Sequence, residues 1–105
     1  MAETGFKVIL AAMLTLMFSV AAQAQDAADV EERYKRSCAV CHAAGAAGAP
    51  KTGVVAEWEP RLAKGMDTLV AAVENGLNAM PPKGMCFDCS SDDYKALILL
   101  MSKAK

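Results

Sequence analysis

The strongest chemical signal in the chain is a run of five residues, Cys38-Ala39-Val40-Cys41-His42. The run is a C-x-x-C-H pattern, which is the attachment signal for c-type haem. Two thiols three positions apart on a helical turn can add to the two vinyl groups of a single haem. The adjacent imidazole then lies under the iron as a proximal ligand. The pattern therefore predicts one covalent haem c, bonded through Cys38 and Cys41, with His42 as an axial iron ligand.

The second axial ligand is expected to be a methionine, because the chain contains a single histidine. Met80 is followed by Pro81-Pro82. Proline fixes φ, and Pro81 also drives the preceding residue toward an extended backbone, so little loop entropy is lost when Met80 binds the iron. We therefore predict Met80 as the ligand, with Met85 on the same loop as the alternative. Met66 and Met101 are expected to fill core space.

A second C-x-x-C pair, Cys86 and Cys89, follows the Met80 loop. Together with Cys38 and Cys41 it has the spacing of a four-cysteine zinc site, although export and the position of His42 argue against zinc. A redox-active dithiol is a further possibility. An exported dithiol oxidoreductase would be accompanied by a thioredoxin-like βαβ pattern, and the sequence does not show one.

The first 24 residues are expected to be a cleaved secretory signal peptide. The apolar run 8–22 is short for a membrane span, which needs about 20 residues. It is followed by Ala22-Gln23-Ala24, an A-x-A cleavage site. An uncleaved anchor or a buried helix is the alternative. Cleavage leaves residues 25–105 as a single domain in the periplasm, an oxidising compartment, with all four cysteines retained.

Length and composition exclude several classes of protein. The chain has 105 residues and a formal net charge of -1, so one domain is expected and a nucleic-acid partner is not. One histidine excludes a two-histidine metal site and a haem with two histidine ligands from this chain.

Three helices are expected to position the haem residues. The first spans 26–37, the second spans 67–75 and stops at Asn75-Gly76, and the third opens on a Ser90–Asp93 capping box and runs to about 102. Residues 43–53 are expected to be a loop, 58–60 a short turn or a single helical turn, and 80–84 a proline-stiffened loop. The helical spacing assigns these residues to the core: Val30, Tyr34, Leu69, Val70, Val73, Tyr94, Leu97, Ile98 and Met101.

These motifs, in this order, resemble the cytochrome c5 family of class I c-type cytochromes. The resemblance covers residues 29–103 and is carried by Cys38–His42, Gly48–Lys51, Trp58, Lys64–Asp67, Asn75–Gly84 and Cys86–Ser90. It implies an all-α class I cytochrome c fold of three to four helices around one haem. It also implies thioethers at Cys38 and Cys41, axial ligation by His42 and Met80, and a disulfide between Cys86 and Cys89. Ser37 and Leu100 depart from the family pattern, where a larger apolar residue and an aromatic are expected.

The expected function is one-electron transfer in a bacterial respiratory chain, and not catalysis. The partners would be a membrane respiratory complex and a terminal oxidase or other periplasmic acceptor, and transient contact with the membrane surface is compatible with this role. A haem peroxidase or sensor is the alternative, but it would need an open iron position and a distal acid–base residue.

Three kinds of side chain could assist at the haem rim. The Trp58 N–H or Arg61 could reach a haem propionate. The alternatives are that Trp58 packs in the core and that Arg61 is exposed to solvent. Lys51, Lys64 and Lys83 could guide a partner or be ordinary surface lysines.

Overall fold

The computed structural model describes the chain from residue 22 and its side chains from residue 27, and the elements in this range are helical. Helices joined by short connections make up this range, which confirms the all-α prediction. Most of the predicted signal peptide, residues 1–24, lies outside the described residues. From residue 22 onward, no helix combines the length and apolar character needed to cross a membrane. The elements are α2 (Ala22–Arg33), the π-helical turn (Tyr34–Cys38), α3 (Ala39–His42), α4 (Val55–Leu62), α5 (Met66–Asn75) and α6 (Ser91–Ser102), with short 3-10 turns at Ala46–Gly48 and Pro82–Met85.

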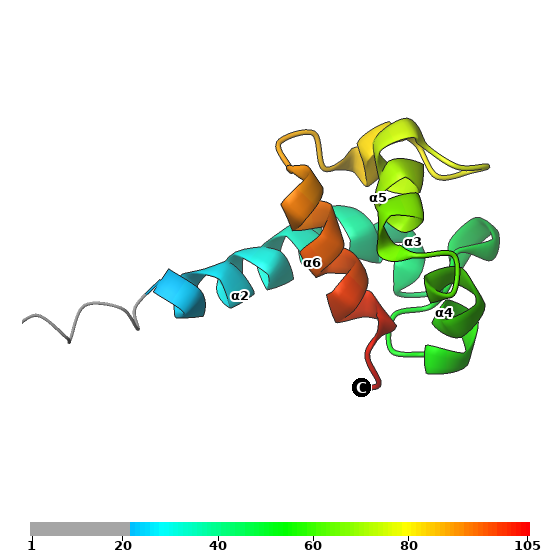
Figure 1. The fold of residues 1–105 in the computed structure, drawn as a ribbon, viewed down its shortest axis with the longest axis horizontal. Coiled ribbons are helices and arrows are strands. Elements are labelled where there is room, and N and C mark those ends of the chain that lie inside the picture. The colour runs from blue at the N-terminus through cyan, green and yellow to red at the C-terminus, as the bar shows by residue number, and fades with distance from the viewer. Residues whose placement is uncertain (1–21) are drawn as a thin grey trace, which may run out of the picture.

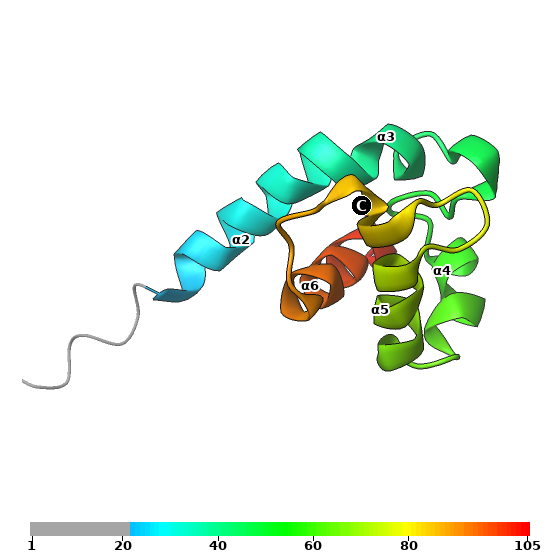
Figure 2. The same cartoon turned by 90° about the horizontal axis from the view of Figure 1, so that it is seen from above.

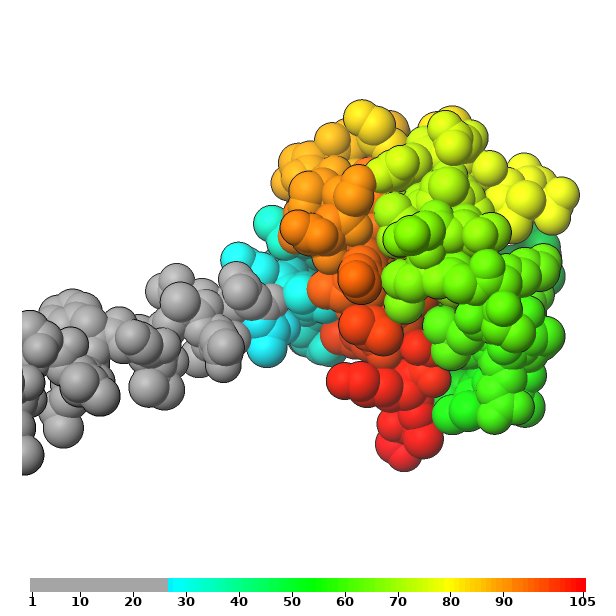
Figure 3. All heavy atoms as spheres, viewed as in Figure 1, coloured from blue at the N-terminus to red at the C-terminus, as the bar shows by residue number. Residues whose placement is uncertain are grey.

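The C-terminal helix α6 holds the other elements together. It contacts α2, α4 and α5, and Figure 1 shows it crossing the α2–α3 run near the end of α2. Figure 3 shows the same helix, in orange and red, between the cyan surface of α2 and the green surface of α4 and α5. The 3-10 turn at Pro82–Met85 contacts both α5 and the π-helical turn. Figure 2 shows this stretch, in gold, beside the run from α2 to α3.

The core follows the apolar face that the sequence predicts for α6. Tyr94, Leu97, Ile98 and Met101 are all buried, at the i, i+3, i+4, i+7 spacing of one helix face. Ile98 and Met101 pack with Trp58 of α4. Tyr94 and Leu97 pack with Cys86. The assignment of Met101 to the core is therefore confirmed, and Met66 packs at the edge of the same core.

Local signals set the ends of α5 and α6 as predicted. At the start of α6 the Ser90 hydroxyl accepts a hydrogen bond from the Asp93 N–H, and the Asp93 carboxylate accepts one from the Ser90 N–H, at 3.2 and 2.8 Å. This is a complete capping box. Helix α5 ends at Asn75 before Gly76, whose φ of 83° is unfavourable for other residue types.

Several element boundaries predicted from the sequence are wrong. The first helix begins at Ala22 and not at residue 26. The first helix does not stop at Ser37, because the chain stays helical through His42. The residues around Trp58 form the eight-residue helix α4, with Pro60 inside it, and not a single turn. Proline at 60 suggests an early stop, because it removes one amide donor. Burial of Trp58 against α6 favours keeping the helix in spite of this loss.

Candidate haem site

A cavity of about 330 Å³ lies among α3, α4, α5 and the loop after α5. Its lining includes Cys38, Cys41 and His42 from the C-x-x-C-H segment and Met80 from the loop. The structure thus brings together residues from two segments that are about forty positions apart in sequence. Two thiols, an imidazole and a thioether facing one cavity are the donor set that a covalently attached haem requires.

The orientation of His42 is set by a backbone carbonyl. Its Nδ1 donates to the Pro50 carbonyl oxygen at 2.9 Å. A carbonyl can only accept, so Nδ1 carries the proton, and in the neutral ring Nε2 is left with its lone pair. A hydrogen bond of this kind at the remote nitrogen fixes the tautomer and raises the basicity of the ligating one. His42 is therefore prepared to bind a metal through Nε2.

The segment Pro50–Gly53 serves as a structural hub behind His42. The Thr52 N–H donates to the His42 carbonyl at 2.9 Å, and the Gly53 N–H donates to the Met101 carbonyl at 2.8 Å. The buried Thr52 hydroxyl oxygen accepts from the Tyr34 hydroxyl at 2.9 Å. These bonds tie the histidine to α6 and to the first helical run.

Met80 is held by its own backbone. Its N–H donates to the Leu77 carbonyl at 2.9 Å and its carbonyl accepts from the Leu77 N–H at 3.0 Å. The loop also packs tightly on Gly76, where a Cβ would lie 3.0 Å from both the Met80 oxygen and the Pro82 nitrogen. Gly76 is thus required twice, for its positive φ and for the close approach of the loop.

The two thiols of the C-x-x-C-H segment differ in burial. Cys41 is exposed, and Cys38 is half-buried. Burial raises the pKa of the Cys38 thiol to about 11, so the neutral thiol is its form at physiological pH. Among the described residues, Cys38 and Cys41 do not cluster with Cys86 and Cys89 as a four-cysteine metal site would require.

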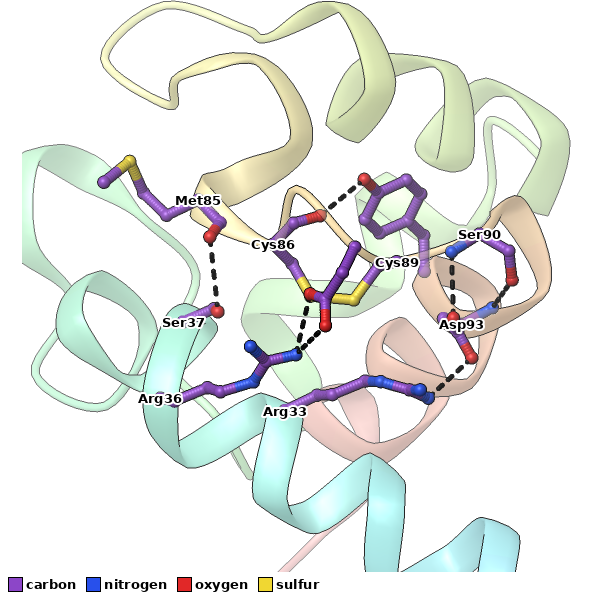
Figure 4. The surroundings of a disulfide bond; sticks show 10 residues. Arg33, Arg36, Ser37, Met85, Cys86, Cys89, Ser90 and Asp93 are labelled. Atoms are coloured by element: carbon purple, nitrogen blue, oxygen red, sulfur yellow. Dashed lines mark hydrogen bonds and ion pairs between the residues drawn. A yellow bond between two sulfur atoms is a disulfide. The ribbon is translucent and has the colours of Figure 1, made fainter.

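The second cysteine pair forms a closed turn. The structure joins the sulfur atoms of Cys86 and Cys89 across a Cα–Cα distance of 5.4 Å, as Figure 4 shows. The Tyr94 hydroxyl donates to the Cys86 carbonyl at 2.9 Å. Burial, the first of several causes, raises the pKa of Tyr94 above its usual value, so the hydroxyl remains a donor at neutral pH.

Trp58 and Arg61, the two residues predicted to reach a haem propionate, both donate hydrogen bonds to backbone carbonyls in the structure. Trp58 and Arg61 both line the cavity, but the Trp58 N–H donates to the Lys51 carbonyl at 2.9 Å and Arg61 donates to the Glu57 carbonyl. The Trp58 ring stacks on His42 with centroids 5.6 Å apart. The alternative prediction, that Trp58 packs in the core, is therefore confirmed. Its contact with a haem edge stays a prediction.

The basic side chains at the cavity differ from the set that the sequence suggests. Lys83 lines the cavity, whereas Lys51 and Lys64 are exposed and do not. Arg36 lines it instead. The sequence analysis did not identify Arg36. Its side chain binds the carboxylate of Asp88, which lies 52 positions away in the chain, and no spacing pattern links the two residues.

Comparison with known proteins agrees with this geometry. The family model described as "Cytochrome C oxidase, cbb3-type, subunit III" matches residues 25–101. Cytochrome c5 of Azotobacter vinelandii is 51% identical over 76 residues, covering 70% of this chain and 88% of that protein.

Solved structures give the same answer. A mono-haem ferrocytochrome c from Shewanella putrefaciens is 62% identical, with a TM-score of 0.65, over 72% of this chain and 94% of that one. A cytochrome c in an electron-transfer complex with nitrite reductase is 42% identical, with a TM-score of 0.63, over 69% and 88%. Relatives of this kind carry one covalent haem and transfer electrons. With a C-x-x-C-H helix and a methionine loop facing one cavity, and with relatives this similar over most of its length, the chain belongs to the cytochrome c5 family of monohaem c-type cytochromes.

Proposed function

We propose that this protein is a periplasmic one-electron carrier of a bacterial respiratory chain, with its haem attached through Cys38 and Cys41 and its iron bound by His42 and Met80. The observation that carries the proposal is the single cavity lined by all four residues. Bound there, a haem c supplies reversible one-electron chemistry at the iron.

The chain's own residues favour electron transfer over substrate chemistry. His42, fixed by the Pro50 carbonyl, and Met80, fixed by Leu77, would fill both axial positions. Because both ligands are held by backbone hydrogen bonds, they need not rearrange when the iron changes charge. A peroxidase or sensor would instead keep one position open and place an acid–base residue beside it. The part of the chain that the structure describes contains an isolated β-bridge but no strand, so a thioredoxin-like oxidoreductase has no support.

Redox proteins are the proposed partners. A cytochrome c that is 42% identical to this chain was crystallised in an electron-transfer complex with nitrite reductase. For this protein we propose a membrane respiratory complex as donor and a terminal oxidase or other periplasmic acceptor. Such contacts are small and short-lived, below about 1,200 Å² in total. The basic side chains of Arg61 and Lys83 at the cavity would raise the association rate with an acidic partner.

The test begins with the ferric absorption spectrum of the holo-protein, where methionine ligation gives a band in the far red. Met80→Ala is expected to abolish this band and to lower the reduction potential, since thioether ligation favours the reduced iron. Met85→Ala is the matched control, because Met85 lines the same cavity but is 58% exposed. Loss of the band in the Met85 variant, with the band kept in the Met80 variant, would move the ligand to Met85.

The electron-carrier role is tested separately. Reduced protein is mixed in a stopped-flow instrument with membranes from its own source, and re-oxidation is followed at the haem. Rapid oxidation supports the proposed role. Failure to oxidise, while the same membranes turn over another carrier, would refute donation to the oxidase. Rapid peroxide turnover by the methionine-ligated form would refute the carrier function itself.

A further inference from the structure

The stretch between Met80 and α6 is a continuous series of hydrogen-bonded turns. Each turn shares residues with the next turn or lies directly beside it. A displacement at the Cys86–Cys89 end of the series should therefore also displace Met80. The donor–acceptor pairs are Met80 N–H to the Leu77 carbonyl (2.9 Å), Gly84 N–H to the Pro81 carbonyl (3.0 Å), Cys86 N–H to the Lys83 carbonyl (2.9 Å) and Cys89 N–H to the Cys86 carbonyl (3.3 Å).

This series contains unfavourable backbone conformations at its centre. Lys83, Gly84 and Met85 all have positive φ, at 64°, 56° and 67°. Left-handed conformations are unfavourable for residues other than glycine, and two of the three are not glycine. Contacts from elsewhere must therefore hold the stretch in place.

The π-helical turn Tyr34–Cys38 supplies two such contacts, visible in Figure 4. The Nη2 of Arg36 lies 2.8 and 2.9 Å from the two carboxylate oxygens of Asp88. The hydroxyl of the buried Ser37 lies 3.5 Å from the Met85 carbonyl oxygen. The small side chain at 37 lets the helix and the loop approach closely.

From this arrangement we infer that Arg36 is a positioning residue for the Met80 ligand. By binding Asp88, Arg36 holds the Cys86–Cys89 turn, and through the overlapping turns Met80, against the helix that carries the haem attachment. Arg36 lies two positions before Cys38, so the pair joins the part of the chain that fixes the haem to the part that supplies the methionine. This inference rests on the proposed ligation of the iron by Met80.

Neighbouring basic residues on the same helical run provide matched controls. Lys35 pairs with Glu31 at 4.0 Å within the helix and does not touch the loop. Arg33 pairs with Asp93 at 2.8 Å, which anchors α6 and not the methionine loop. Lys35→Gln therefore removes one positive charge at the adjacent position while leaving the Arg36–Asp88 ion pair intact.

The experiment measures how easily Met80 leaves the iron. Imidazole is titrated into the ferric holo-protein, and loss of the far-red band reports replacement of the methionine. Arg36→Gln is expected to raise the apparent imidazole affinity about two- to fivefold, the upper part of the range for one exposed ion pair, while Lys35→Gln matches wild type. Asp88→Asn is expected to act in the same direction as Arg36→Gln. Because these two changes alter the net charge oppositely, agreement between them excludes a long-range field effect.

A charge-swapped variant provides the rescue. The double change Arg36→Asp with Asp88→Arg is expected to return the imidazole affinity toward that of wild type. The inference is overturned if Arg36→Gln matches Lys35→Gln, or if the Arg36 and Asp88 variants shift the affinity in opposite directions. A wild-type spectrum without the far-red band would instead refute the Met80 ligation, and the inference with it.

Discussion

The hydrogen bond from Trp58 to Lys51 is expected to contribute measurably to stability, and Trp58→Phe tests it. Trp58 is 4% exposed, packs with Ile98 and Met101, and donates its N–H to the Lys51 carbonyl at 2.9 Å. Phenylalanine keeps an aromatic ring against His42 but removes the donor and part of the ring volume.

The magnitude follows from two contributions. Loss of a neutral hydrogen bond costs about 1 kcal/mol, and not more, because the Val54 N–H still donates to the same carbonyl at 3.2 Å. Complete removal of a buried tryptophan side chain costs about 3–5 kcal/mol, and a phenylalanine that retains most of the contact should cost about 1 kcal/mol of that. The sum of about 2 kcal/mol corresponds to a fall in Tm of about 8–16 °C for a domain of this size.

The assay is thermal unfolding of the ferric holo-protein followed by far-ultraviolet circular dichroism. Trp58→Ala, measured beside it, should be less stable than Trp58→Phe. A Tm for Trp58→Phe within about 2 °C of wild type would mean that the bond to Lys51 and the indole packing contribute almost nothing. The assignment of Trp58 as a stabilising core residue that anchors the Lys51 carbonyl would then be wrong.

Two further predictions concern stability. The double change Cys86→Ser with Cys89→Ser is expected to lower the free energy of unfolding by at most about 2 kcal/mol in denaturant titrations, because a bond across three positions closes a very short loop; a loss of twice that size would show that the pair does more than close this turn. The backbone N–H of Ser90, the largest of several causes, holds the pKa of Asp93 below its usual value of 3.8, so the stabilisation is fully present above that pH and is lost as the pH falls through the lower folded-state pKa. Wild type should therefore lose Tm below about pH 4 more steeply than Asp93→Asn, and parallel Tm profiles would contradict this.

Local signals predicted much of the architecture. The C-x-x-C-H spacing, the Met-Pro-Pro sequence and the Ser90–Asp93 capping box act over a few residues, and each lies where it was expected. The apolar face of α6 was also predictable, since four residues at helical spacing identify it without knowledge of any partner. The structure brings the predicted haem residues to one cavity, while the bonds that would form there stay a prediction.

The features that the sequence did not predict depend on contacts between residues far apart in the chain. The tether between Arg36 and Asp88 joins positions on a helix and in a turn, and neither residue type is unusual where it stands. The extension of α4 through Pro60 depends on burial of Trp58 against α6, a tertiary contact that outweighs the local signal to stop. The left-handed backbone at Lys83 and Met85 contradicts the preference of both residues and could not be read from them.

The two proposed ligands are positioned mainly by main-chain groups, and this has a consequence for how the site tolerates change. His42 is oriented by the Pro50 carbonyl, and Met80 by its paired hydrogen bonds to Leu77. Main-chain donors and acceptors persist when side chains change, so most surface substitutions should leave ligand geometry intact. Sensitivity should instead concentrate at the few residues that fix the path of the main chain. These are Gly76, whose lack of a side chain admits the Met80 loop, the buried Thr52 behind His42, and the Arg36–Asp88 pair.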